Sequence, residues 1–167
     1  MPWHIRQAHL RDLPRLLQLQ REAYSTLVES EAAITSRLRL APGWCWVAEN
    51  HGEVIAYLLT HPWAHALPPA WNTPLMHLPA HATRLYVHDL ALGHGARGSG
   101  VARRLVNTAL QHARRGHFHE VQLIAVQSSK RFWERFGFRE VVAEGLLREK
   151  LGSYGEDACL MGMRVRR

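Results

Sequence analysis

The chain has 167 residues, of which 47% are hydrophobic and 21% charged, and these proportions predict one globular domain over 1–167 and exclude a disordered chain. The formal net charge is +7, and 19 of the 21 cationic residues are arginines, which is compatible with nucleic acid but equally with a phosphorylated cofactor. No apolar run approaches the roughly 20 residues that cross a bilayer, no signal peptide is apparent, and two cysteines make no disulfide framework, so we expect a cytoplasmic protein.

The first part of the chain is expected to contain a short strand, two helices and a hairpin. Ile5 begins the strand, and leucines at helical spacing predict a helix from about residue 12 to 26. A second, weaker helix is expected over 31–40. Two apolar runs, 44–49 and 54–60, flank Asn-His-Gly, which is typical of a β-hairpin.

Residues 61–83 contain five of the eight prolines together with Trp63 and Trp71. A long loop without regular structure inside a compact domain is usually functional or mobile. We therefore expect this segment to serve a function.

The second part of the chain alternates between strand and helix patterns. We expect strands over 84–92, 120–126, 138–142 and 158–165, and helices over 101–115 and 129–136. Alternating strands and helices imply a parallel crossover, whereas the hairpin implies antiparallel pairing. The predicted fold class is α/β, with a mixed, partly antiparallel central sheet flanked by helices.

Two interpretations compete for the glycine-rich loop that follows the strand over 84–92. Gly93, Gly95 and Gly98 fit a dinucleotide-binding fingerprint, which also needs an acid at the far end of the next strand. Glu120 lies instead at the beginning of that strand, and no second nucleotide-binding half follows, so this interpretation is disfavoured.

The other interpretation uses residues 97–102, Arg-Gly-Ser-Gly-Val-Ala, which run directly into a helix. Small residues let the main-chain N–H groups of 98–102 converge, and the helix N-terminus adds partial positive charge, which suits a pyrophosphate. The alternative is a turn that merely connects the strand to the helix.

The motif at 97–102, preceded by Leu90-Ala91-Leu92, resembles the acetyl-CoA loop of the GCN5-related N-acetyltransferases. Thirty residues later, Phe-Trp-Glu-Arg-Phe-Gly-Phe over 132–138 is similar to the second signature of that family. The order of the expected elements also follows the family, so the resemblance covers nearly the whole chain. Within the family the chain most resembles the serotonin N-acetyltransferase subfamily.

The resemblance implies that acetyl-CoA lies between the fourth and fifth strands, which separate there. Main-chain groups of Leu90 and Leu92 would pair with the pantetheine arm and polarise the thioester. The predicted cofactor-binding residues are Leu90, Leu92, Arg97, Gly98, Ser99, Gly100, Val101, Ala102, Ser128 and Phe132.

Direct attack of an amine on the thioester requires a base, stabilisation of the oxyanion and departure of a thiolate. Side chains alternate along a strand, so Tyr86, His88 and Leu90 are expected on one face and Asp89 on the other, in a structural contact. His88 is the candidate base, acting through water, and the alternative is a packed or surface imidazole.

Trp133 stands where the family has its proton-donating tyrosine, and an indole N–H cannot supply an acid proton. Tyr154 or Tyr86 is the candidate replacement, or the thiolate leaves unassisted. Val126 occupies the position of a family asparagine, with Gln127 and Ser128 beside it. These departures concern the proton path more than cofactor binding.

Glu22, Glu29 and Glu31 fall in the helical segment that, as the resemblance implies, lines the acceptor site. Acids there, with Trp63 and Trp71 in the long loop, would suit a cationic amine with an apolar body, and Glu29, Trp63 and Trp71 are the predicted substrate contacts. The alternative is a solvated acid and packed aromatic side chains. Pairs of histidines at 77 and 81, or 117 and 119, lack further ligands at suitable spacing, so no metal is expected.

The sequence therefore predicts an acetyl-CoA-dependent N-acetyltransferase that acetylates a primary amine of a small molecule by direct attack in a ternary complex. The alternatives are a non-catalytic acyl-CoA-binding module and a basic nucleic-acid-binding domain. We expect a monomer or homodimer that has neither nucleic acid nor membrane as a partner.

Overall fold

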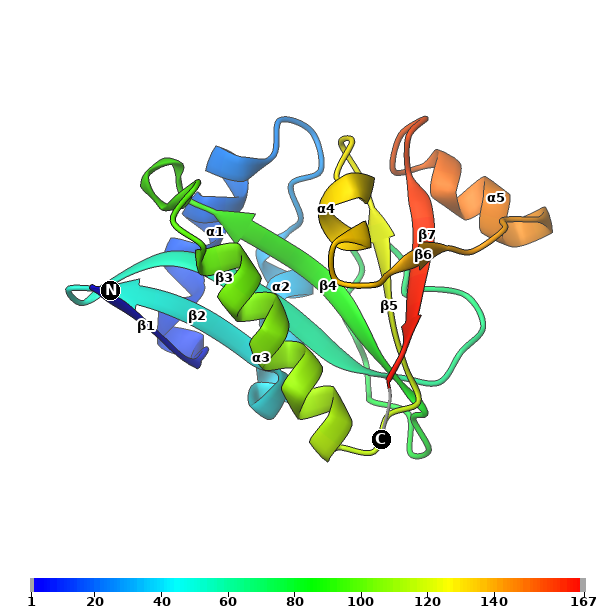
Figure 1. Cartoon of the computed structure of the whole chain (residues 1–167), viewed down its shortest axis with the longest axis horizontal. Helices are drawn as coiled ribbons and strands as arrows, with labels where there is room; N and C mark the ends of the chain where they lie inside the picture. The colour runs from blue at the N-terminus through cyan, green and yellow to red at the C-terminus, as the bar shows by residue number, and fades with distance from the viewer. Residues whose placement is uncertain (1, 166–167) are drawn as a thin grey trace.

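Seven strands form one sheet in the computed structural model, which describes residues 2–165 (Figure 1). The strand order is β1-β2-β3-β4-β5-β7-β6, and β4 and β5 are the one parallel pair in the described sheet. The strands are β1 (Trp3–Gln7), β2 (Cys45–Asn50), β3 (Glu53–Trp63), β4 (Arg84–Leu92), β5 (Glu120–Ala125), β6 (Arg139–Glu140) and β7 (Cys159–Arg164).

Helices cover both faces of this sheet. They are α1 (Leu13–Ala23), α2 (Glu31–Leu40), α3 (Val101–Arg115), α4 (Lys130–Glu134) and α5 (Gly145–Gly152). Figure 1 shows α3 lying across the face nearer the viewer, with α1 and α2 behind the sheet. The buried side chains accordingly form two clusters, one that includes Leu105 of α3 and one that includes Leu16 of α1 and Ile34 of α2.

The predicted fold class is confirmed, and α3 and β4 have the predicted bounds. The first helix ends at Ala23 rather than near residue 26, because Tyr24 is already extended. Helix α5 lies where we expected a polar loop; it begins at Gly145, whose positive φ of 54° gives no sequence signal for a helix start. Of the expected strand over 138–142, two residues form β6 and pair with β7.

Strand β4 contains one extra residue, His88. Leu59 of β3 pairs with Asp89 and Thr60 pairs with Val87, so His88 has no partner across the ladder. Such a bulge interrupts the alternation of side chains. As a result, the alternation of side chains between the two faces of the sheet is shifted by one residue at His88.

The bulge corrects two expectations about β4. Leu90 and Leu92 pack with the cluster on the α3 side, whereas Asp89 bonds to Tyr24 and Tyr57, which belong to the α1 and α2 side. His88, bonded to the segment before α2, lies on that same side. His88 and Asp89 therefore share a face, and Leu90 does not share the face of His88.

The parallel pairing of β4 with β5 stops at this bulge. It runs from Arg84 opposite Glu120 to Val87 opposite Leu123 and goes no further. Beyond it, β5 pairs with β7 alone, and β4 with β3 alone. The two strands therefore separate, leaving main-chain groups of β4 without a neighbouring strand.

The segment between α1 and α2 is held over the sheet by Gln20. Its side-chain amide donates to the carbonyl oxygen of Glu29 at 2.8 Å and accepts from the Glu29 N–H at 3.0 Å. Both contacts are buried, and Ser30 then begins α2 by accepting the N–H of Ala33 at 3.2 Å. Gln20 thus fixes the main chain from which the Glu29 side chain projects.

Replacing Gln20 with alanine is expected to destabilise the protein by about 1–3 kcal/mol, because it leaves the buried N–H and C=O of Glu29 unpaired. Urea unfolding measures the loss. Gln18→Ala is the matched control, since Gln18 is exposed on the same helix and should change stability by less than about 0.5 kcal/mol. Equal effects of the two substitutions would contradict the role given to Gln20.

Candidate active site

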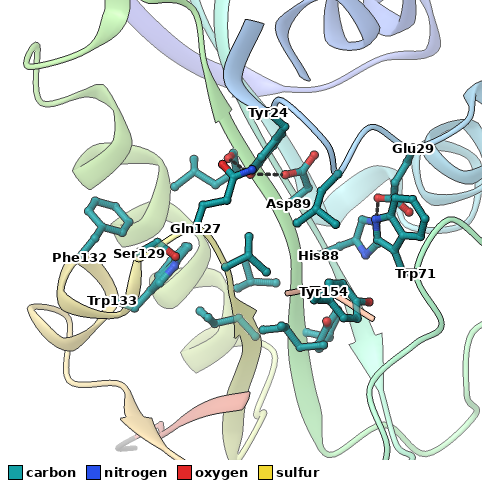
Figure 2. A pocket seen from close by; sticks show the side chains of 17 residues that line it. Tyr24, Glu29, Trp71, His88, Asp89, Gln127, Ser129, Phe132, Trp133 and Tyr154 are labelled. Carbon is teal, nitrogen blue, oxygen red and sulfur yellow. Dashed lines mark hydrogen bonds and ion pairs between the residues drawn. The ribbon is translucent and has the colours of Figure 1, made fainter. Parts of the chain in front are cut away.

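A cavity of about 200 Å³ opens where β4 and β5 separate (Figure 2). One wall comes from β4 and the segment before α2, and the other from β5, α4 and the turn between them. The residues that line it are Tyr24, Leu27, Glu29, Trp71, Tyr86, Val87, His88, Asp89, Leu90, Leu123, Ile124, Val126, Gln127, Ser129, Phe132, Trp133 and Tyr154.

His88 and Glu29 form a hydrogen bond at one end of this cavity, although they lie 59 residues apart in the chain. The His88 Nε2 atom contacts Glu29 Oε1, and the main-chain N–H of Asn72 donates to Glu29 Oε2 at 2.8 Å. Both carboxylate oxygens are therefore already bound within the protein.

The Glu29 carboxyl is ionised at neutral pH. Burial acts to raise its pKa, but the charge and hydrogen bond of His88, with smaller contributions from Arg37 and the Asn72 amide, bring the pKa below its usual value. A carboxylate only accepts hydrogen bonds, so the hydrogen between the two groups belongs to His88 Nε2. The nitrogen of His88 that Glu29 leaves free is Nδ1.

Asp89, the next residue, has different partners. The hydroxyl of Tyr57 bonds to Oδ2, and the hydroxyl of Tyr24 lies 2.7 Å from Oδ1. Burial raises the pKa of Asp89 above its usual value and outweighs the bonds from Tyr57 and Tyr24 and the charge of His88. The structural contact expected for Asp89 is present, on the face that also carries His88.

A second histidine, His61 of β3, lies beside His88, with ring centroids 6.2 Å apart. It is fully buried and does not line the cavity. Burial, with the charge of His88, lowers the pKa of His61 to about 3. His61 is therefore neutral at ordinary pH, and His88 is the histidine that reaches the cavity.

Aromatic side chains surround the His88 end of the cavity. Trp71, Tyr86 and Tyr154 all line it, and Figure 2 shows Tyr154 on the side of His88 rather than beside Trp133. Burial raises the pKa of both tyrosines, so each keeps its hydroxyl hydrogen at neutral pH. They offer aromatic faces and hydroxyl donors to a bound molecule.

Trp133 and Phe132 of α4 line the opposite wall. Trp133 is buried and packs edge-on against Phe132 and Phe138, with ring centroids 4.9 and 5.7 Å apart. Trp133 therefore serves as a packed wall residue.

The glycine-rich loop has the backbone geometry that an anion site requires. Gly98 and Gly100 have φ values of 74° and 82°, and α3 begins directly after Gly100. Among the described residues, the amides of Gly98, Gly100 and Ala102 meet no acceptor, while those of Ser99 and Val101 make long local bonds of 3.3 and 3.4 Å. Three amides at the start of a 15-residue helix thus remain available to a ligand.

Arginine side chains surround this loop: Arg97, Arg103 and Arg104 are all exposed. The other loop residues predicted to bind the cofactor follow the same path, with Ser99 exposed, Ala102 half-buried and Val101 in the core.

Main-chain groups of Leu90 and Leu92 face the cleft. The N–H of Gly93 donates to Ile55 of β3 at 2.9 Å, and alternate residues of an antiparallel strand direct these groups to opposite edges. The main-chain groups of Leu90 and Leu92 therefore point away from β3, towards the gap left by β5. Leu90 also lines the cavity with its side chain, whereas Leu92 does not.

Like Leu92 and the residues of the glycine-rich loop, Trp63 and Ser128 are predicted to lie at the site but do not line the cavity. The indole N–H of Trp63 donates to the carbonyl oxygen of Leu67 at 2.9 Å, and the ring packs against His61. Ser128 is exposed and bonded to Asp157 through its N–H and hydroxyl, and the neighbouring Ser129 lines the cavity instead.

The loop over 64–83 is attached to the His88 end of the cavity. Asn72 accepts the N–H of Ser30 at 2.6 Å, Arg37 donates to the carbonyl oxygen of Thr73 at 3.2 Å, and Lys150 of α5 donates to that of Pro68. These contacts hold the loop across the segment before α2 and place Trp71 in the wall.

Several residues of this site carry no signal in the sequence, namely Gln20, Tyr24, Tyr57 and Asn72. Each acts through a partner that is distant in the sequence or is a main-chain group, and no spacing pattern marks such pairs. The described residues contain no group of three or more His, Cys, Asp or Glu that could hold a metal. No described helix has the length and apolarity to cross a membrane.

Solved structures with this fold include Ard1 from Thermoplasma volcanium (TM-score 0.78, 18% identity, 100% of both chains covered). They also include the loading GNATL domain of CurA from Lyngbya majuscula (0.81, 15%, 98% of each). A third is Arabidopsis thaliana Naa50 in complex with the bisubstrate analogue CoA-Ac-MVNAL (0.71, 14%, 98% of this chain and 99% of that one). At these identities the similarity concerns the fold.

A search of curated protein sequences found no match. A family model described as acetyltransferase (GNAT) family matches residues 11–138. Since this match covers well over half of the chain, the protein belongs to the GNAT acetyltransferase family, for which acetyl-CoA is the expected cosubstrate.

Proposed function

We propose that the protein transfers an acetyl group from acetyl-CoA to a primary amine of a small molecule, by direct attack in a ternary complex. The observation that carries this proposal is the His88–Glu29 pair, placed at the mouth of the gap between β4 and β5. A base and a cofactor cleft therefore meet in one cavity.

The cleft has the groups needed to hold acetyl-CoA. The amides of Gly98, Gly100 and Ala102, at the N-terminus of α3, are suited to the pyrophosphate, and the exposed arginines nearby are suited to a further phosphate. The cleft-facing main chain of Leu92 offers strand-like hydrogen bonds to the pantetheine arm, whereas the Leu90 carbonyl oxygen already contacts the Tyr24 hydroxyl and leaves the Leu90 N–H for the thioester. Phe132 supplies an apolar wall.

His88 would remove the proton of the incoming ammonium group through Nδ1, directly or through one water. Glu29 holds the other nitrogen, which fixes the tautomer and stabilises the imidazolium that forms. Acetyl-CoA supplies the electrophilic carbonyl and the thiolate leaving group. The Leu90 N–H, which faces the cleft, is the donor that we assign to the developing oxyanion.

The leaving thiolate takes no proton from Trp133, because an indole is a hydrogen-bond donor but not an acid at neutral pH. Tyr86 and Tyr154 keep their hydrogens and line the cavity, which makes them the candidate donors. The ring centroid of Tyr86 lies 6.3 Å from that of His88, and Figure 2 shows Tyr154 on the side of His88 and away from α4, so we include a water between the donor and the sulfur.

The acceptor end favours a small amine over a long peptide. The loop over 64–83 is bonded both to the segment before α2 and to α5, and so closes over this end. Trp71, Tyr86 and Tyr154 would present aromatic faces to a cation. Glu29 is proposed to affect the amine indirectly, by holding His88, because both of its carboxylate oxygens are already bound within the protein.

One alternative function has a specific observation in its favour. Trp133 occupies the position of the family's acid, and a chain without that acid could bind acyl-CoA without catalysis. This alternative predicts acetyl-CoA binding and no release of free thiol with any amine.

Release of CoA thiol from acetyl-CoA, measured with arylalkylamines, polyamines, amino acids and peptides, tests the proposed function. We expect turnover with small primary amines and little with peptides. His88→Ala should lower kcat by about 100-fold or more while acetyl-CoA affinity is nearly kept, because the base is lost and the phosphate site is not. His119→Ala is the control, since His119 is exposed and remote from the cavity lining.

Unchanged turnover of His88→Ala would remove His88 from the mechanism. Tight binding of acetyl-CoA with no thiol release from any amine would favour the non-catalytic module.

Gly100→Ala tests the phosphate loop. Its φ of 82° lies in the left-handed region, which costs an alanine about 1–2 kcal/mol, so we expect the loop to shift and acetyl-CoA affinity to fall about tenfold. Gly95→Ala is the matched control, because Gly95 is in the same loop, has open space for a Cβ and has no positive φ. Equal affinities of the two variants, measured by calorimetry, would argue against this placement of the pyrophosphate.

A further inference from the structure

The hydroxyl of Tyr24 contacts two oxygen atoms. It lies 2.7 Å from Asp89 Oδ1 and 2.7 Å from the carbonyl oxygen of Leu90. Both separations are those of an undivided O–H···O hydrogen bond, whereas one hydrogen shared between two acceptors gives weaker and longer contacts, so we assign a hydrogen atom to each contact. A phenol has one, and an amide carbonyl has none. The second hydrogen must come from the Asp89 carboxyl group.

Tyr57 accounts for the other oxygen of this carboxyl group. Its hydroxyl donates to Asp89 Oδ2, and burial keeps the pKa of both Tyr24 and Tyr57 well above their usual value, so both remain phenols. With a hydrogen on Oδ1, Asp89 donates to Tyr24 and Tyr24 donates to Leu90. Every contact in the chain then contains one hydrogen.

The charged groups around Asp89 are compatible with this assignment. His88 adjoins it on β4, Glu29 faces it from the segment before α2, and Arg37 lies on α2. Among the described residues, none of the three forms a hydrogen bond or ion pair with the Asp89 carboxyl group. Burial raises the pKa of Asp89 and outweighs the charge of His88, which acts to lower it, while the smaller effect of the negative charge of Glu29 acts in the same direction as burial.

We propose that Asp89 is a neutral carboxylic acid at neutral pH, and that its hydrogen completes a chain, Tyr57–Asp89–Tyr24–Leu90, that positions the main chain of β4 at the thioester end of the cleft. Asp89 is a positioning residue in this proposal. Its protonation rests on the hydrogen-bond geometry, whereas its effect on catalysis rests on the proposed function.

An ionised Asp89 would reverse this arrangement. The Tyr24 hydrogen would turn to the carboxylate, and the Leu90 carbonyl oxygen would face the phenol oxygen at 2.7 Å without a hydrogen between them. Two oxygens at that separation repel, so Leu90 would move. The Leu90 N–H, which we assign to the oxyanion, would move with it.

Carboxyl-carbon NMR of the whole protein, labelled with ¹³C in its three aspartates, tests the protonation directly. We expect the signal that disappears in Asp89→Asn to have a carboxylic-acid shift at pH 7. Asp12 is the internal reference: burial acts to raise its pKa, but Arg6 outweighs burial and lowers it, so its signal should be that of a carboxylate. A carboxylate shift for Asp89 at pH 7 would overturn the proposal.

If Asp89→Asn does not fold, Asp12→Asn and Asp157→Asn assign the remaining signal by elimination. Because this measurement requires no turnover, it separates a failure of the protonation state from a failure of the proposed function.

The pH dependence of stability provides a second test, with a definite sign. A carboxyl group whose pKa is raised on folding holds its proton longer in the folded state, so stability falls as pH rises through the interval between the unfolded and folded pKa. We therefore expect the unfolding equilibrium constant of the natural protein, divided by that of Asp89→Asn, to rise with pH in that interval. The expected rise is up to about tenfold per pH unit. A shift in the opposite direction would show a stabilising carboxylate and contradict the proposal.

Catalysis distinguishes a positioning acid from an anion that binds the substrate. Asp89→Ala should lower kcat about tenfold or more, and Asp89→Asn should restore most of the loss, because the amide can donate to Tyr24 and accept from Tyr57. The KM for the amine should be similar in the Asn variant and the natural protein. A large rise of that KM in Asp89→Asn would instead identify Asp89 as an anionic contact for the ammonium group.

Discussion

A single additional residue in β4 determines the geometry of this site. The bulge at His88 ends the pairing of β4 with β5 at Val87, and the cavity opens at that point. It also places His88 and Asp89 on the same face, which an uninterrupted strand would not allow. The placement of His88, the buried Asp89 and the gap between β4 and β5 therefore all depend on one irregularity in the sheet.

Two carboxyl groups adjoin His88 and differ in their ionisation because their partners differ. Glu29 receives hydrogen bonds from an imidazole and a main-chain amide, both of which favour the anion. Asp89 contacts the hydroxyl groups of Tyr24 and Tyr57, and the Tyr24 hydroxyl also contacts the carbonyl oxygen of Leu90. Because Tyr24 has one hydrogen for two contacts, this arrangement requires a hydrogen on the Asp89 carboxyl group. Environments that separate the pKa values of neighbouring acids give them different tasks. Here one acid supports the base and the other supports the main chain.

Strong local patterns were sufficient to predict α3 and β4 with their bounds, and the two signatures predicted the family. The bulge at His88 could not be predicted, because it arises from pairing with β3 and leaves no mark in the alternation of residue types. The partnership of Glu29 with His88 depends in turn on Gln20, which acts on main-chain groups. A hydrogen bond from a side chain to a main-chain group does not depend on the side chain of the partner residue. No pattern of residue types therefore indicates such a bond.

The long loop over 64–83 has no regular structure, and ordering such a segment costs conformational entropy for every residue. Several of its hydrogen bonds to the rest of the protein reach the segment before α2, α2 itself and α5, near the His88 end of the cavity. Two others attach its ends to the sheet: Arg84 of β4 donates to the carbonyl oxygen of His65 at 2.7 Å, and the N–H of His119 donates to that of Thr83 at 2.8 Å. The glycine-rich loop, by contrast, is short and consists of a 3-10 turn followed by residues 97–100 and then the start of α3. The cost of ordering the loop over 64–83 is therefore offset by contacts along its whole length, and these contacts hold Trp71 in the cavity wall beside His88 and Tyr154.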